Sequence, residues 1–381
     1  MSDDAVREAL LNTVRRFVTD RLRPLERKVA EDNQVPEEVI AEMRELGLFG
    51  LSIPVEYGGL GLSMEDECLA TIELCKASPA FRSFIGTNVG IGSHGLVMFG
   101  TEAQKRAYLP RIASGEIITS FALTEPEAGS DSGSVQTRAR RDGDHYVIDG
   151  AKRYITNAGR AHLFTVMART NPEVKGGGGV SAILVPRDTP GLSVGKPEQK
   201  MGQHGAHIHD VNFDGVRVPV ENRLGEEGQG FRMAMQVLDR GRLHISAVCI
   251  GVAERLVADS VAYALERRQF GKPIAEQQLI QGMIADSKTE ALAARALTLE
   301  TARKRDGGET VTLEAASAKL YASEMVGRVA DRAVQIFGGA GYTADHGIER
   351  LYRDVRIFRI YEGTSEIQRL VVARETLRRG G

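Results

Sequence analysis

The sequence predicts an α+β protein in which two helical regions flank a region of antiparallel strands. Residues 1–120 and 230–381 carry apolar residues at helical spacing, interrupted by helix start and stop signals. Residues 121–229 instead hold short apolar runs separated by Asp-Gly and Pro-Gly turn signals. Helices and strands do not alternate along the chain, which argues against a doubly wound parallel sheet.

Length and composition fit a soluble protein of several domains. The 381 residues are enough for two or three domains. The patterns along the chain divide them into an N-terminal helical domain (1–120), a middle β domain (121–229) and a C-terminal four-helix bundle (230–381). A net charge of −2 argues against general nucleic-acid binding, and no apolar run is long enough to span a membrane. The three cysteines form no C-x-x-C pair, which indicates reduced core residues and a cytoplasmic location.

The N-terminal region contains several helix start signals. The first 17 residues read as an amphipathic helix and resemble neither a signal peptide nor a transit peptide. Pro36 marks a helix start and Gly47 a helix end. Ser63 with Asp66, and Thr101 with Gln104, have the spacing of capping boxes. We therefore expect short helices throughout this region.

The middle and C-terminal regions differ in periodicity. In the middle region, runs such as HYVID and SAILVP predict antiparallel strands. In the C-terminal region, periodicity and breakers predict helices over roughly 231–266, 276–305, 310–337 and 365–378.

Glu362 lies in the turn before the last predicted helix, within the stretch YEGTSEIQ. Ser365 and Gln368 fit a capping box, so the free N–H groups of a helix start should lie close to Glu362. From the turn alone, Glu362 is a cap, a solvated loop residue or a catalytic base.

Two other patterns match known ligand-binding motifs but are poor evidence for ligand binding. GIGSHG, residues 90–95, matches G-x-G-x-x-G, but helical sequence lies on both sides, so a dinucleotide site is not expected. The histidines of HGAHIHD, residues 204–210, lack the spacing of a metal site, and we predict no bound metal.

Two further segments have the composition of a cofactor site. FALTEPEAGSDSG, residues 121–133, offers hydroxyl groups and open backbone to a heterocycle or a phosphate. QIFGGAGYTADHGIERLYRD, residues 335–354, places glycines after a long predicted helix. Taken singly, each glycine has an equally good structural explanation. Gly129 can serve a turn, and Gly338 with Gly339 can end a helix.

Together with IYEGTSEIQR, these segments resemble the acyl-CoA dehydrogenase family, and the resemblance covers essentially the whole chain. It implies bound FAD and the conversion of a saturated acyl-CoA thioester to a trans-2-enoyl-CoA. Glu362 would take the α-proton while a hydride passes to flavin N5. The resemblance also implies an electron transfer flavoprotein as the electron acceptor, and a homotetramer.

The resemblance assigns further residues. Those implied to bind FAD, partly across subunits, are Phe121, Leu123, Thr124, Gly129, Ser130, Tyr154, Ile155, Thr156, Arg267, Phe270, Gln278, Gln335, Ile336, Gly338, Gly339, Thr364 and Glu366. Those implied to contact substrate are Ser130, Asp239, Arg242 and Gly363.

Three positions depart from the family pattern. Tyr154 stands where many members have tryptophan, and His204 where many have arginine. Some members carry the base on the first C-terminal helix, at the position of Gly241, which leaves Glu362 without a competing carboxylate there.

Other functions stay open on sequence alone. The same fold hosts flavin oxidases and monooxygenases, and a non-catalytic acyl-CoA-binding protein is a further alternative. The acyl chain is not specified, with short or medium straight chains as the first expectation.

Overall fold

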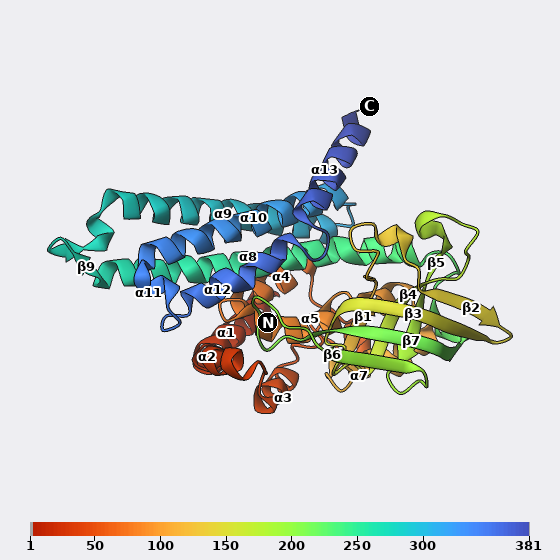
Figure 1. Cartoon of the computed structure of the whole chain (residues 1–381). Coiled ribbons are helices and arrows are strands. Elements are labelled where there is room, and N and C mark those ends of the chain that lie inside the picture. The colour runs from red at the N-terminus through yellow and green to blue at the C-terminus, as the bar shows by residue number, and fades with distance from the viewer. Residues whose placement is uncertain (1–2, 381) are drawn as a thin grey trace.

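The computed structural model describes residues 3–380 and contains helices, a sheet and more helices in chain order (Figure 1). The predicted α+β class and the order of its parts are confirmed. The sheet lies at one end of the molecule and the long C-terminal helices extend toward the other (Figure 1).

Short helices form the first part of the chain. Ser63 accepts a hydrogen bond from the N–H of Asp66, and Thr101 and Gln104 form a complete capping box, so both predicted caps are confirmed. The α-helices are α1 (Asp3–Phe17), α2 (Arg23–Asp32), α3 (Glu37–Glu45), α4 (Met64–Leu74), α5 (Pro79–Val89), α6 (His94–Phe99) and α7 (Glu102–Ala113).

The middle part is one sheet in the order β6-β7-β3-β2-β4-β5-β8, with β1 paired to β4. Most neighbours are antiparallel, as predicted, but β4 pairs in parallel with β1, where Thr119 lies opposite Leu163, and with β2. The strands are β1 (Thr119–Ala122), β2 (Arg138–Asp142), β3 (His145–Thr156), β4 (Leu163–Arg169), β5 (Val180–Pro186), β6 (Leu192–Pro197), β7 (Ile208–Pro219) and β8 (Arg223–Leu224).

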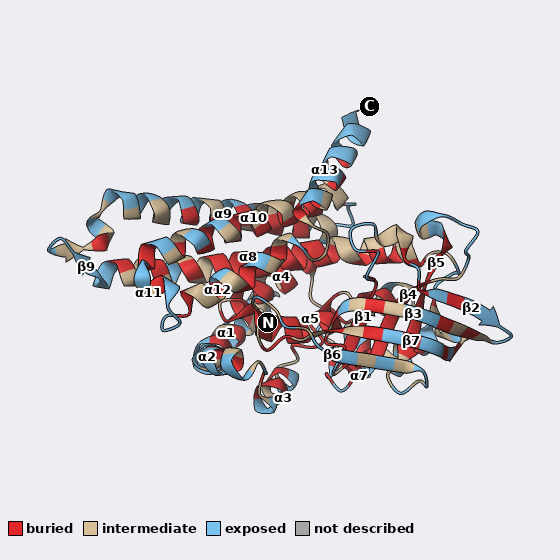
Figure 2. Ribbon diagram, viewed as in Figure 1, coloured by how far each residue is buried: buried red, intermediate tan, exposed pale blue. Residues whose placement is uncertain are grey.

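The C-terminal part packs around α8, whose 37 residues run from the bundle to the edge of the sheet (Figure 1). Its middle is buried against α4 and α10, where small residues allow close packing (Figure 2). The elements are α8 (Gly230–Glu266), β9 (Arg268–Gln269), β10 (Lys272–Pro273), α9 (Gln278–Asp306), α10 (Thr312–Phe337), α11 (Gly339–Tyr342), α12 (Ile348–Val355) and α13 (Ser365–Gly380).

The structure also places the patterns and cysteines singled out in the sequence. Residues 90–95 follow α5 and run into the start of α6, so they do not connect a strand to a helix. His207 and His209 each contact a backbone carbonyl, and no group of side chains in residues 3–380 is arranged to hold a metal ion. All three cysteines are buried and free. Across the same residues, no helix has both the length and the apolar character needed to cross a bilayer.

Candidate active site

Glu362 lies in a tightly held turn between α12 and α13. Its φ is +54°, a left-handed conformation that few non-glycine residues adopt. Nε2 of Gln368 donates to the carbonyls of Glu362 and Gly363 at 3.2 and 3.1 Å. Nζ of Lys319, on α10, donates to the carbonyl of Gly363 at 2.7 Å. Side chains from α10 and α13 therefore hold the backbone of Glu362 in place.

The predicted capping box at Ser365 is wrong. Ser365 is the first residue of α13, and its hydroxyl donates to Glu324 at 2.6 Å. Oγ1 of Thr364 instead accepts from the N–H of Ile367 at 3.2 Å, and Gln368 bonds the turn rather than Ser365. The cap begins one residue earlier because Ser365 has a long-range partner on α10.

Thr364→Val is expected to destabilise the protein by about 1 kcal/mol, the usual cost of losing an N-cap hydroxyl. Urea denaturation would measure this change, with Thr364→Ser as the control that keeps the hydroxyl. Equal stability of Thr364→Val and the unmodified protein would contradict the assignment of the cap.

The side chain of Glu362 occupies space left open by Gly241 on α8. A Cβ added at Gly241 would lie 2.0 Å from Oε2 of Glu362. That oxygen is buried and has no hydrogen-bond partner. An unpartnered buried carboxylate oxygen is costly, and in a native protein such an atom is commonly functional.

Three cations act on this carboxylate. Burial raises the pKa of Glu362 above its ordinary value of 4.5, whereas Arg82, Lys319 and Arg242 lower it. Burial is the largest of these effects. Glu362 is thus a carboxylate of increased proton affinity whose ionised form is still supported by neighbouring positive charge.

The predicted substrate residues Asp239 and Arg242 lie on α8 beside Gly241. Arg242 donates to Asp239 at 2.5 Å, and the hydroxyl of Thr312 donates to the other oxygen of Asp239 at 2.8 Å. Arg242 and Gly363 therefore lie around Glu362, with Asp239 fixed next to Arg242. Ser130, the fourth predicted residue, lies in an exposed loop after β1.

Helix α5 connects this site to the segments predicted to bind flavin. Nδ2 of Asn157, directly after Thr156, donates to the carbonyl of Phe84 at 2.9 Å and to Oγ1 of Thr87 at 2.8 Å. Arg82, one of the cations near Glu362, lies on the same helix. The end of β3 therefore bonds the same short helix that carries Arg82, whose charge acts on the candidate base.

The predicted flavin residues 121–124 and 154–156 lie together at the adjacent ends of β1 and β3. Nζ of Lys152 donates to the carbonyl of Leu123 at 3.0 Å, and the N–H of Arg153 donates to that of Thr124 at 2.8 Å. Lys152 also pairs with buried Glu125 at 2.7 Å, which binds the loop after β1 to the sheet. Ile155 and Leu123 are buried, so their contribution to a ligand would be backbone or pocket wall.

The groups exposed here fit FAD. Tyr154 is 52% exposed at the end of β3, and the Arg153 guanidinium lies 5.0 Å from the centroid of its ring. An added Cβ at Gly129 would meet no atom within 4 Å, so the backbone is open to a ligand. Thr124, Ser130 and Thr156 supply hydroxyls. A flavin needs flat surface, open backbone and such donors.

The remaining predicted FAD residues lie elsewhere in the chain. Arg267, Phe270 and Gln278 lie at the tip of the bundle opposite the sheet, around β9 (Figure 1). Gln335, Gly338 and Gly339, where α10 meets α11, are exposed, whereas Ile336 packs in a small core with Ala264 and Ile274. Thr364 caps the start of α13, and Glu366 is the second residue of that helix. The structure does not bring these groups together with β1 and β3 within one chain.

Sequence reasoning missed Arg82 and Lys319. Both are buried cations whose charge acts on Glu362. The available signal was a single charged residue within an apolar helical run, SPAFRSFIG for Arg82 and AASAKLYAS for Lys319. Such a residue predicts a buried partner without identifying it.

Family models match three consecutive parts of the chain. They are described as the N-terminal domain of acyl-CoA dehydrogenase (residues 4–116), its middle domain (120–216) and its C-terminal domain (228–377).

Individual proteins match nearly the full chain. A probable acyl-CoA dehydrogenase of Bacillus subtilis, YngJ, is 43% identical over 96% of both chains. Acryloyl-CoA reductase (NADH) of Anaerotignum propionicum is 43% identical over 98% of this chain and 94% of that protein. The solved structure of butyryl-CoA dehydrogenase from Megasphaera elsdenii is 38% identical over 99% of both chains, with a TM-score of 0.95. This chain therefore belongs to the acyl-CoA dehydrogenase family, whose members are FAD-dependent oxidoreductases acting on CH–CH groups.

Proposed function

We propose that this protein dehydrogenates a saturated acyl-CoA thioester to the trans-2-enoyl-CoA, with Glu362 as the base. The observation that carries the proposal is the carboxylate of Glu362, whose Oε2 is buried and unpartnered beside Gly241. A general base must be free to approach a proton on its substrate, and a raised pKa makes it effective near neutral pH. A cap or a solvated loop residue would have neither property.

The chain's own groups have distinct tasks in this reaction. Oε2 of Glu362 would remove the α-proton and then hold it, while Arg82, Lys319 and Arg242 limit the cost of the charged carboxylate before transfer. The N–H of Glu362 would donate to the thioester oxygen, where charge develops. FAD, when bound along β1 and β3, supplies the acceptor for the hydride that leaves the β-carbon.

The residues that would bind substrate are Asp239, Arg242, Gly363 and Ser130. The first three lie at or beside Glu362, and Ser130 belongs to the exposed loop on the flavin side. We propose short or medium straight acyl chains as the substrate class, which agrees with the butyryl-CoA dehydrogenase named above.

Saturation of an enoyl-CoA is the second candidate function. It is favoured by the relative named as an acryloyl-CoA reductase, at 43% identity. The same base would then deliver a proton to the α-carbon. An oxidase, a monooxygenase and a non-catalytic acyl-CoA-binding protein are the further alternatives.

Anaerobic titration of the purified flavoprotein tests the proposal. Saturated acyl-CoAs of graded length and branching are added while the flavin absorbance is followed. Rapid bleaching by one group supports dehydrogenation and identifies the substrate class. Bound flavin that no acyl-CoA bleaches would contradict it. If no saturated acyl-CoA bleaches the flavin but an enoyl-CoA reoxidises the dithionite-reduced protein, the reductase is favoured. A protein purified without flavin would favour the non-catalytic alternative.

The rate of flavin reduction is expected to rise with pH across the acidic range, because only ionised Glu362 accepts a proton. Burial raises the pKa of this group above 4.5, so activity is lost as pH falls through a midpoint higher than that value. Stopped-flow measurements with saturating substrate in buffers of matched ionic strength would record it. A rate that is constant or falls as pH rises through this range would contradict the role of Glu362.

We further propose a homotetramer that passes electrons to an electron transfer flavoprotein. Large apolar side chains are exposed at the bundle tip, including Phe270 at 93%, Leu279 at 84% and Tyr342 at 82%. Isolated apolar residues are common on surfaces, but several of this size together indicate an interface. Arg267, Phe270, Gln278 and the segment Gln335–Gly339 would then reach the FAD of a neighbouring subunit.

A further inference from the structure

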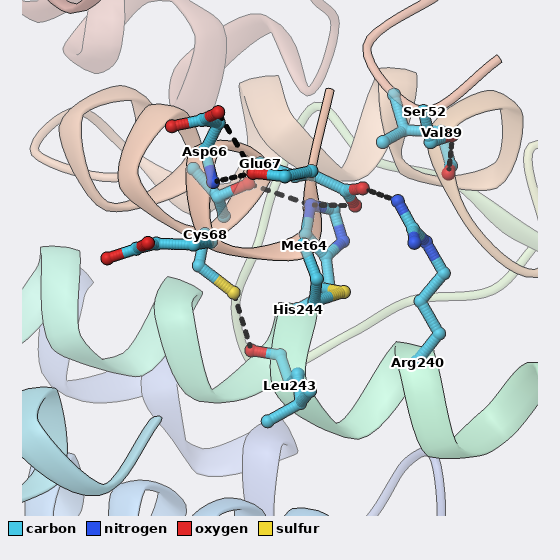
Figure 3. A network of polar contacts seen from close by, with 12 residues as sticks. Ser52, Met64, Asp66, Glu67, Cys68, Val89, Arg240, Leu243 and His244 are labelled. Atoms are coloured by element: carbon cyan, nitrogen blue, oxygen red, sulfur yellow. Dashed lines mark hydrogen bonds and ion pairs between the residues drawn. The ribbon is translucent and has the colours of Figure 1, made fainter. Parts of the chain in front are cut away.

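A network of buried polar side chains joins α4 to α8 near Glu362 (Figure 3). Glu67 on α4 pairs with Arg240 on α8, and its Oε1 lies 3.6 Å from Nε2 of His244. The same nitrogen lies 2.8 Å from Oγ1 of Thr71, one turn further along α4. The hydrogen bond to Thr71 therefore fixes the orientation of the His244 ring, with Glu67 beside it.

The other ring nitrogen of His244 contacts Arg82. Nη2 of Arg82 is hydrogen-bonded to Nδ1 of His244. A guanidinium only donates, so Nδ1 is the acceptor and the ring proton lies on Nε2, facing Thr71. Burial, with Arg82 and Arg240 nearby, keeps the pKa of His244 well below 6.5. His244 is therefore neutral near pH 7 and remains an acceptor for Arg82.

This contact holds Arg82 close to Glu362. Gly241, against which Oε2 of Glu362 packs, lies three residues before His244, so both positions share one face of α8. Gly86 leaves room for the guanidinium, because a Cβ there would lie 2.9 Å from Nη1 of Arg82. Among the cations that act on Glu362, Arg82 has the largest effect.

Arg82 and Glu362 are nevertheless not paired. Within residues 3–380, no hydrogen bond or ion pair joins the two side chains. Nε of Arg82 and Oε2 of Glu362 are both buried without a hydrogen-bond partner. A buried guanidinium and a buried carboxylate attract each other, and within residues 3–380 the hydrogen bond that occupies the guanidinium goes to His244.

The titratable groups around these side chains come from several elements. Glu362 is acted on by Arg82 from α5, Arg242 from α8 and Lys319 from α10, next to Tyr361 in its own turn. The charge of Arg82 lowers the pKa of five groups: His244 and Cys249 of α8, Cys75 after α4, Tyr361 and Glu362. Among the groups whose pKa the charge of Arg82 affects, Glu362 is the carboxylate, and His244 is the group that accepts a hydrogen bond from Arg82.

We propose that His244 is a positioning residue that holds the Arg82 guanidinium where it favours ionised Glu362 without closing onto it as an ion pair. A direct pair would occupy the oxygen that must reach the α-carbon. Thr71 acts through His244 by fixing its ring. The proposal rests on the proposed function of Glu362 as the base.

His244→Phe tests it, because the new ring is similar in size and cannot accept a hydrogen bond. Arg82 then turns to the free oxygen of Glu362. With saturating substrate, flavin reduction in stopped flow is expected to slow by at least about tenfold, since the base is no longer free. The midpoint of its pH dependence should fall by about one unit, because the carboxylate gains a direct partner. His244→Gln keeps an acceptor and should restore both values in large part.

Arg82→Met provides the background that separates positioning from general structural damage. In that background, His244→Phe should change neither the midpoint nor the rate any further. If His244→Phe still shifts the midpoint of the pH dependence in the Arg82→Met background, the proposal is overturned. It is also overturned if His244→Phe alone leaves the midpoint unchanged, even if the rate is lower at every pH. If His244→Phe does not fold, Thr71→Val removes the partner of Nε2 and should give a smaller shift in the same direction; no shift would overturn the proposal.

Glu362→Gln distinguishes the two proposals from each other. If this variant still reduces flavin, the proposed base is wrong whatever the His244 variants do. If it is inactive while His244→Phe behaves like the unmodified protein, only the positioning role fails.

Discussion

Replacement of Glu362 by glutamine is expected to slow flavin reduction by at least about 1,000-fold while FAD stays bound. An amide of nearly the same size cannot take up a proton, and positioned general bases contribute about 10²–10⁴-fold. The turn itself should survive, because Gln368 and Lys319 hold it through backbone carbonyls. Anaerobic stopped-flow reduction by the best acyl-CoA from the titration measures the effect.

Glu309→Gln is the matched control for this variant. Glu309 is exposed in the loop between α9 and α10, so the same chemical change there should leave flavin reduction as it is. Substantial turnover by Glu362→Gln, with the flavin spectrum of the unmodified protein, would be inconsistent with a base at this position.

Gly241→Ala is expected to reduce the rate by about 100-fold, the second largest effect. Its methyl group would lie 2.0 Å from Oε2 of Glu362, closer than any non-bonded contact allows. Because α8 is packed on several sides, the carboxylate rather than the helix must move, and a displacement of about 1 Å can cost 10²-fold. The steady-state rate and a thermal melt should be measured together.

Gly282→Ala is the control for the effect of alanine on a helix. Gly282 is an exposed residue within α9, and an added Cβ there would meet no atom within 4 Å. This change should stabilise the helix by about 1 kcal/mol and leave the rate unaltered. A Gly241→Ala protein of normal activity would show that Glu362 does not depend on this space.

Local signals in the sequence predicted much of the fold. Ser63 and Thr101 cap helices because each cap needs only residues within four positions. The same reasoning failed at Ser365, whose hydroxyl bonds Glu324, 41 residues away. Helix α12 was not predicted, although Ile348, Leu351 and Val355 have helical spacing, because the glycines before it indicated a loop.

The site was predictable only in part, for a related reason. Glu362, Asp239 and Arg242 belong to recognisable segments, but Arg82 and His244 meet across 162 residues of sequence. No periodicity encodes such a pair. His204 replaces an expected arginine and lies 3.3 Å from the carbonyl of Lys200, a contact that does not explain the replacement.

The space between Gly241 and Glu362 also constrains how such an enzyme can evolve. It holds one carboxylate, since even a methyl group at 241 would collide with Glu362. A lineage that moves its base from the turn to α8 must therefore pass through a form with two colliding acids or a form with none. Both intermediates are impaired, so the two positions should change together.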